Sequence, residues 1–229
     1  VKVQWRLQVF RGLLAIAMLW SFSVGIKDLA LTQAYTLFFI APLLVSVLAW
    51  PILGEKAHGF QWFTLLLGLA GVVVALRPST DGLLTWGSAA VLAAATCYAI
   101  SAVVSRRLSR TDTTDSQVFW VLVFLGLGAG LLALPNWQPL TAQHWALMPA
   151  LAISGFIGQL AITDAFKHGK AAAVAPFEYS ALGWSIGIDV ALWSVWPDAL
   201  TLGGATIVIV AGLLLMRRER GVVVSTSGA

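Results

Sequence analysis

Eight long apolar segments, each long enough to cross a lipid bilayer, dominate this sequence of 229 residues. A membrane-spanning helix needs about 20 mostly apolar residues. The segments cover residues 10–26, 32–53, 60–76, 83–104, 118–134, 145–166, 171–193 and 200–216. Apolar and polar residues do not alternate along them, as they would in the strands of a membrane barrel. The sequence therefore predicts an all-α, polytopic membrane helix bundle with about eight transmembrane helices.

The composition excludes several other classes of protein. Hydrophobic residues make up 59 % of the chain and charged residues 10 %, whereas a soluble domain has about 25 % charged residues. This excludes a soluble enzyme and a disordered chain. Cys97 is the single cysteine, so no intrachain disulfide forms. The formal net charge of +4 suggests no nucleic-acid partner, because the basic residues stand between apolar segments rather than on one folded face.

The positive charges predict how the chain lies in the membrane. When the eight segments are threaded through a bilayer, 12 of the 14 Lys and Arg residues fall on one side, and Lys27 and Arg77 are the exceptions. Loops rich in Lys and Arg stay in the cytoplasm. We therefore expect a multi-pass protein of the inner (plasma) membrane with a cytoplasmic C-terminus.

An internal repeat also follows from the threading. Residues 27–77 align with residues 167–217 at an offset of 140, with Lys at the start and Arg at the end of both stretches. The two stretches cross the membrane in opposite directions. Inverted repeats are typical of secondary transporters, whose substrate sites lie near the midplane between the two copies.

Three short motifs follow the same order in the chain as in a known family. They are Ile-Ala-Pro-Leu at 40–43, Leu-Gly-Glu at 53–55 and Ala-Pro-Phe-Glu-Tyr at 175–179. With their spacing, they make the sequence resemble the EamA-type transporters of the drug/metabolite transporter superfamily. Typical members of that superfamily have ten helices in two inverted five-helix repeats.

The resemblance implies a division of the chain into three parts. Residues 1–78 would be the last three helices of a first repeat, so we expect two further helices before Val1 in a complete protein. Residues 83–220 would be a second, five-helix repeat, and residues 221–229 a tail.

Carboxylates inside apolar segments are the main candidates for a site. An ionisable group at the bilayer centre costs at least about 2.5 kcal/mol, so it is a functional candidate by default. Glu178 follows Lys170 by eight residues, about 12 Å along a helix, which places it near the midplane. On a continuous helix Glu178, Leu182, Ser185 and Asp189 share one face, and we expect this face to line a cavity. Glu178 would bind a cationic substrate or a proton; the alternative is a Glu buried by packing. For Asp189 the alternative is a solvated carboxylate at the outer interface.

Other polar and aromatic residues inside the segments suit the lining of a site for a small amphipathic molecule. They are Trp20, Tyr35, Thr36, Tyr98 and Gln159. Ordinary helix packing is the alternative for each of them, and Gln159 with Thr163 could also join neighbouring helices.

These patterns favour a secondary transporter that moves a small organic metabolite or drug-like solute by alternating access. The alternatives are a noncatalytic membrane scaffold and a membrane-embedded enzyme. An HExxH motif, a metal-ligand cluster and a phosphate loop are missing from the sequence, so we expect no enzymatic activity, metal or cofactor. The expected partners are a small-molecule substrate and the lipid bilayer, with a proton as candidate coupling ion. A monomer and a homodimer both remain open.

Overall fold

The computed structural model describes residues 4–29, 31–77, 85–137, 139–194 and 196–227, and within these ranges the chain is helical throughout its regular elements. The elements are α1 (Trp5–Asp28), α2 (Leu31–Phe38), α3 (Ala41–Leu53), α4 (Gly59–Leu76), α5 (Trp86–Leu108), α6 (Thr114–Ala133), η1 (Leu134–Asn136), α7 (Ala142–His168), α8 (Ala171–Val174), η2 (Ala175–Ser180), α9 (Ala181–Trp193) and α10 (Ala199–Ser227). This confirms the predicted all-α class.

Seven candidate membrane spans, among the described residues, are long and apolar enough to cross a bilayer. The predicted segment 171–193 is the exception, because it is divided into α8, the 3-10 helix η2 and α9. Pro176 explains the division, since proline has no amide hydrogen to donate and its ring crowds the preceding turn. The eighth expected helix is thus a broken one. A smaller break at Phe39 and Ile40 separates α2 from α3, just before Pro42.

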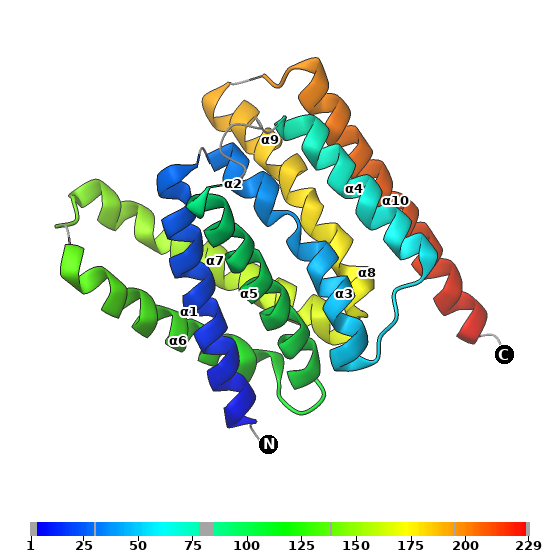
Figure 1. The fold of residues 1–229 in the computed structure, drawn as a ribbon, viewed down its shortest axis with the longest axis horizontal. Coiled ribbons are helices and arrows are strands. Elements are labelled where there is room, and N and C mark those ends of the chain that lie inside the picture. The colour runs from blue at the N-terminus through cyan, green and yellow to red at the C-terminus, as the bar shows by residue number, and fades with distance from the viewer. Residues whose placement is uncertain (1–3, 30, 78–84, 138, 195, 228–229) are drawn as a thin grey trace.

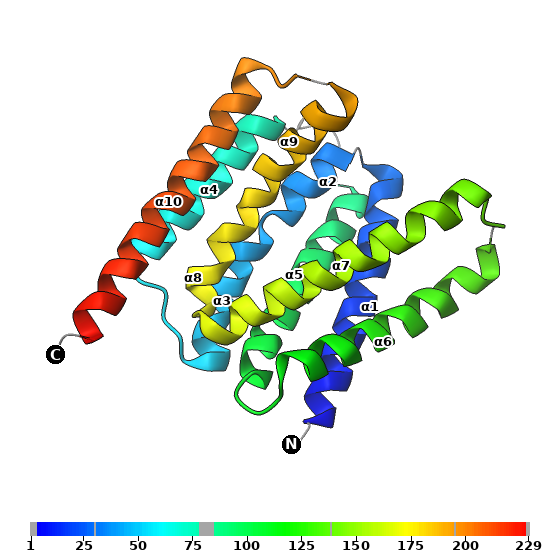
Figure 2. The same ribbon diagram turned by 180° about the vertical axis from the view of Figure 1, so that it is seen from behind.

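The helices lie as a row of pairs (Figures 1 and 2). Helices α4 and α10 run side by side at one edge, α2–α3 and α8–η2–α9 occupy the middle, and α6 and α7 spread apart at the other edge. Both chain ends lie toward the same end of the bundle, together with the α3–α4, α5–α6 and α7–α8 connections. We call this the terminal end and the other the opposite end. The two broken helices therefore lie at the centre of the row.

Glycines allow α4 and α10 to touch along their backbones. A Cβ atom added at Gly71 of α4 would lie 2.8 Å from the carbonyl oxygen of Gly204 in α10. One added at Gly204 would lie 2.6 Å from the backbone nitrogen of Ala75. Small residues drive close helix packing in membranes, where lipid offers the same apolar surroundings as a neighbouring helix. The α4–α10 pair depends on these two positions.

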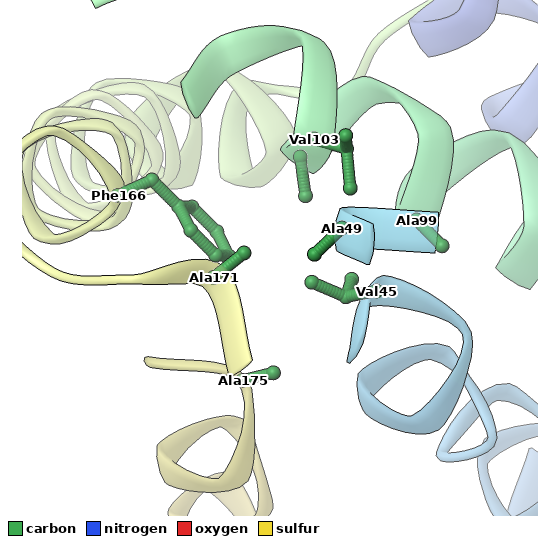
Figure 3. Packing of buried hydrophobic residues seen from close by; sticks show 8 residues of the cluster. Val45, Ala49, Ala99, Val103, Phe166, Ala171 and Ala175 are labelled. Atoms are coloured by element: carbon green, nitrogen blue, oxygen red, sulfur yellow. The ribbon is translucent and has the colours of Figure 1, made fainter. Parts of the chain in front are cut away.

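A core of small side chains joins the middle helices toward the terminal end (Figure 3). Its members from α3, α5, α7, α8 and η2 are Val45, Ala49, Ala99, Ala102, Val103, Phe166, Ala171 and Ala175. Phe166 is the one large side chain among them, 2 % exposed, and it points toward Ala171 in Figure 3. This core closes the space between the middle helices on that side of the bundle.

Candidate functional site

A cavity of about 780 Å³ lies where the two broken helices meet α5 and α7. Aromatic side chains contribute much of its wall, with one acid among the described lining residues. These aromatic residues and the acid are Tyr35, Phe38, Phe39, Tyr98, Phe177, Trp184 and Glu178. A mostly apolar cavity with a few polar groups is the usual form of a small-molecule site.

Glu178 is the main polar feature of this cavity. Its carboxyl group is hydrogen-bonded to the Tyr98 side chain across from α5. Its Oε1 atom is buried and has no hydrogen-bond partner in the structure. A buried acceptor without a donor costs about 1–3 kcal/mol. The cavity therefore contains an acceptor that a cationic group or a proton would satisfy.

The 3-10 helix η2 gives Glu178 this position. Tyr179, the residue after Glu178, is 1 % exposed. It packs away from the cavity, into a core with Leu65 of α4 and Leu182 of α9. A Cβ atom added at Gly68 of α4 would lie 2.6 Å from the Tyr179 ring, so this glycine makes room for the ring. Packing of Tyr179 against α4 leaves Glu178 facing the cavity.

The predicted face of Glu178, Leu182, Ser185 and Asp189 needs correction. That face assumed a continuous α-helix with about 100° per residue, but a 3-10 helix turns by about 120°. Leu182 consequently packs in the core against α4. The cavity wall contains Glu178, Ala181 and Trp184 instead. The side chains of Ser185 and Asp189 lie outside the described residues.

The structure places the five other proposed site residues in different settings. Tyr35 and Tyr98 line the cavity with Glu178. Thr36 is buried within α2. Trp20, on α1, is 56 % exposed and is not among the described lining residues. Gln159 donates a hydrogen bond to Thr163 one turn further along α7, 3.4 Å away, on a face beside the cavity wall.

Arg11 is a buried polar residue that the sequence analysis counted only as a membrane-edge charge. It is 3 % exposed. Its guanidinium donates to the carbonyl oxygen (3.4 Å) and to Oε1 (3.3 Å) of Gln117 in α6, and to Oγ1 of Thr163 in α7 (3.3 Å). The signal available in the sequence was its place inside the predicted span 10–26.

An ionic contact, which we call the latch, joins four helices at the terminal end. Arg106 Nε of α5 donates to Oε1 of Glu55, which follows α3, at 3.0 Å. Arg106 Nη1 also donates to the carbonyl oxygens of Phe166 (3.2 Å) and Lys167 (2.6 Å) at the end of α7. Glu55 Oε2 accepts from the backbone nitrogen of Ala171, where α8 begins, at 2.9 Å. The latch holds this end of the middle helices together.

A second ion pair lies at the opposite end, between Arg77 and Asp198. It joins the end of α4 to the start of α10, and both side chains are about half exposed. Hydrogen bonds from Thr201 and from Arg77 lower the pKa of Asp198 from 3.8 to about 2. The α4–α10 pair is thus fastened at this end as well as along its length.

The model of the EamA-like transporter family matches residues 1–77 and 85–218 of this chain. The chain belongs to that family. Three relatives have names that state an activity. The pseudopaline exporter of Pseudomonas aeruginosa is 28 % identical over 216 residues, 92 % of this chain and 75 % of the relative. The S-adenosylmethionine uptake transporter of Rickettsia felis is 27 % identical, over 93 % and 72 %. The riboflavin transporter of Vibrio cholerae is 27 % identical, over 94 % and 74 %.

A solved crystal structure shares the fold, with a TM-score of 0.83 at 20 % identity, over 94 % of this chain and 79 % of the other. Family membership and the named relatives identify this EamA-like chain as a multi-pass membrane transporter of small metabolites, rather than an enzyme. They confirm the resemblance drawn from the motifs at 40–43, 53–55 and 175–179.

Proposed function

We propose that this transporter carries a small organic molecule with a cationic group, by alternating access, and that Glu178 and Tyr98 bind that group. The unpaired buried Oε1 of Glu178 inside an aromatic cavity is the observation that supports this. A cation beside this oxygen would replace a missing hydrogen bond with a charge-assisted one, which is about twice as strong as a neutral one. Aromatic rings around it also attract cations through their faces.

One relative's named cargo, S-adenosylmethionine, carries cationic groups, as this proposal requires. Its adenine and the isoalloxazine of uncharged riboflavin, the cargo named for another relative, are both flat nitrogen-containing ring systems, which stack on aromatic side chains. The cavity offers Phe39, Phe177 and Trp184 for such stacking. The substrate is therefore proposed as a nitrogen-containing, partly aromatic or amphipathic metabolite.

Two features support alternating access. The cavity lies beside both helix breaks, and broken helices surround the midplane sites of many secondary transporters. At the repeat offset of 140, the break at Phe39 and Ile40 corresponds to residues 179–180, at the end of η2. The latch of Glu55 and Arg106 joins the middle helices at the terminal end. Its release would open a route from that end to the cavity.

The remaining parts of the proposal concern orientation, coupling and assembly. The excess of Lys and Arg at the terminal end supports a cytoplasmic location for that end, with the protein in the inner membrane. A proton is the proposed coupling ion, because it competes with a cationic substrate for the same Glu178 oxygen. One chain supplies the described cavity wall, so a monomer is the proposed transporting unit.

Substitution of Glu178 by Gln tests the proposal. In a proteoliposome counterflow assay, we expect Glu178→Gln to lower the transport rate of S-adenosylmethionine, which carries cationic groups, at least tenfold, with the expression level unchanged. The matched control is Asp164→Asn, which removes an exposed carboxylate on α7 away from the cavity. A Glu178→Gln variant that transports S-adenosylmethionine at the rate of the unmodified protein would contradict the assignment.

A further inference from the structure

The cluster around Arg11 has more hydrogen-bond donors than acceptors. Arg11 of α1, Ser105 of α5 and Gln117 of α6 are all at most 3 % exposed, as is Thr163 of α7. Gln117 Oε1 accepts from both Arg11 (3.3 Å) and Ser105 (3.0 Å). Thr163 Oγ1 accepts from both Arg11 (3.3 Å) and Gln159 (3.4 Å). Each side-chain acceptor is therefore used twice.

Two donors in this cluster have no acceptor at all. They are Nε of Arg11 and Nε2 of Gln117, both buried. The bonds that Arg11 does make are long, at 3.3–3.4 Å, and lead to uncharged groups. A buried cation without an opposite charge is strongly unfavourable. The cluster lacks one negatively charged acceptor.

The buried carboxylate of Asp112, between α5 and α6, is already engaged. Asp112 accepts from Nε2 of Gln8 (2.8 Å), from the backbone nitrogen of Gln4 (3.4 Å) and from the hydroxyl of Thr111 (2.9 Å). Arg11 is not among its partners in the described part of the chain. Gln8 Oε1 is a further unpaired acceptor one turn from Arg11, but an amide oxygen carries no net charge and does not neutralise the guanidinium.

The cluster lies next to the cavity. Tyr98, which is bonded to Glu178, lies within electrostatic range of Arg11. Tyr98 and Ser105 are seven residues apart on α5, so they share a face and lie about 10 Å apart along the helix. On α7, Gly158, Ala161 and Ile162 line the cavity, while Thr163 on the adjacent face accepts a hydrogen bond from Arg11. The same two helices thus border both places.

We propose that Arg11 and Gln117 bind a carboxylate of the transported molecule, so that the substrate class is a zwitterion with its cationic group at Glu178. This inference rests on the proposed function and extends it. The unmet acceptor at Glu178 and the unmet donors at Arg11 are opposite in kind, and Tyr98 lies near both. A zwitterion whose cationic group and carboxylate are several bonds apart carries the two complementary groups.

Access to Arg11 requires movement of α7. Arg11 is covered in this structure, and among the described residues its hydrogen bond to α7 goes to Thr163. Because α7 covers Arg11 with one face and forms the cavity wall with the next, a shift of α7 would join the two places. A carboxylate entering at that moment would replace the long bond to Thr163 with a charged one.

A zwitterion and its decarboxylated form test this as a pair. The compounds are S-adenosylmethionine, whose sulfonium is several bonds from its carboxylate, and decarboxylated S-adenosylmethionine. Ligand binding stabilises the folded state by an amount set by affinity, so thermal shifts of the purified protein give relative affinities. For the unmodified protein we expect the acid member of this pair to bind at least tenfold more tightly than the amine.

The variants separate the two sites. Arg11→Gln should bring the acid-to-amine affinity ratio close to one, and Arg11→Lys, which keeps the charge, should retain part of the preference. If Arg11→Gln does not fold, Arg11→Lys still tests the site, because it should reduce the preference only in part. Glu178→Gln should weaken both members by the same factor. Arg107→Gln, which removes an exposed charge near the same end, should leave the ratio unchanged.

The outcomes distinguish this inference from the function it extends. An unmodified protein that binds acid and amine equally, or an Arg11→Gln variant that keeps the preference, overturns the carboxylate site and leaves the cation site standing. A preference that depends on Arg11 while Glu178→Gln changes neither affinity supports the carboxylate site and contradicts the proposed role of Glu178. Absence of stabilisation by both compounds overturns both proposals.

Discussion

Replacement of Glu55 by Gln tests whether the latch keeps the terminal end closed. One carboxylate there accepts from Arg106 Nε at 3.0 Å and from the Ala171 backbone nitrogen at 2.9 Å. The Arg106 and Glu55 side chains are 20 % and 12 % exposed. Their contact is therefore partly shielded from water and joins α5, α8 and the end of α3 in a single arrangement.

The structure sets the size of the expected effect. Two unit charges 3.0 Å apart attract by about 5–6 kcal/mol at an effective dielectric constant of about 20. Desolvation of both groups offsets much of this attraction, and a hydrogen bond to a charged group contributes about 1.5–3 kcal/mol net. Gln keeps one acceptor oxygen and loses the charge. We therefore expect closure to weaken by about 2 kcal/mol, which is about 30-fold in the ratio of closed to open states.

Cysteine labelling in the cavity measures this ratio. In a Cys97→Ser background, Ala161→Cys provides a single thiol on the cavity wall. An impermeant maleimide added from the terminal side should label it at least tenfold faster when Glu55 is replaced by Gln. The control is Lys56→Gln, which removes the neighbouring charge, located 5.2 Å from the centre of the Trp50 ring. A Glu55→Gln rate within twofold of the background would refute the reasoning.

Two further predictions concern the α4–α10 pair. Gly204→Ala should lower the free energy of unfolding by about 1–3 kcal/mol, because the added Cβ meets the α4 backbone. Thermal unfolding in nanodiscs measures this loss. The control Gly203→Ala should show no such loss, because nothing lies within 4 Å of a Cβ added there. Hydrogen bonds from Thr201 and from Arg77 lower the pKa of Asp198 from 3.8 to about 2. The ionised carboxylate therefore stabilises the fold fully above pH 3.8, and this stabilisation is lost as the pH falls through about 2. The difference in melting temperature between the unmodified protein and Arg77→Gln should therefore shrink on acidification over this range, and a difference that stays constant would contradict it.

Segment length and charge were enough to predict the helical class and the crossing segments. Hydrophobic runs of this length report directly on the lipid that surrounds them. The same signal does not show how a run is divided, so the 3-10 turn at Pro176 and the resulting place of Leu182 in the core became visible only in the structure. The motif at 175–179 contains Pro176 and Glu178, but it does not show how the break at Pro176 changes which residues share a helix face.

The sequence likewise indicated the role of some charged residues and not of others. Glu178 stood out because it lies deep inside an apolar segment, whereas Arg11 lies near the start of one and resembled the basic residues at membrane edges. Glu55 and Arg106 are 51 positions apart, and a single sequence gives no sign that they meet. Pairings over such distances depend on how helices pack, which local patterns do not encode.

The backbone contact between Gly71 and Gly204 has a consequence for how this molecule moves. Helix α4 belongs to the first half of the chain and α10 to the second, yet they touch without intervening side chains and are tied again by Arg77 and Asp198. The first and second halves of the chain are therefore joined at this edge by the α4–α10 contact, which opposes their separation. In the proposed alternating access, the α4–α10 pair would therefore move as one unit against the remaining helices, and the chain would bend at the broken helices in the middle.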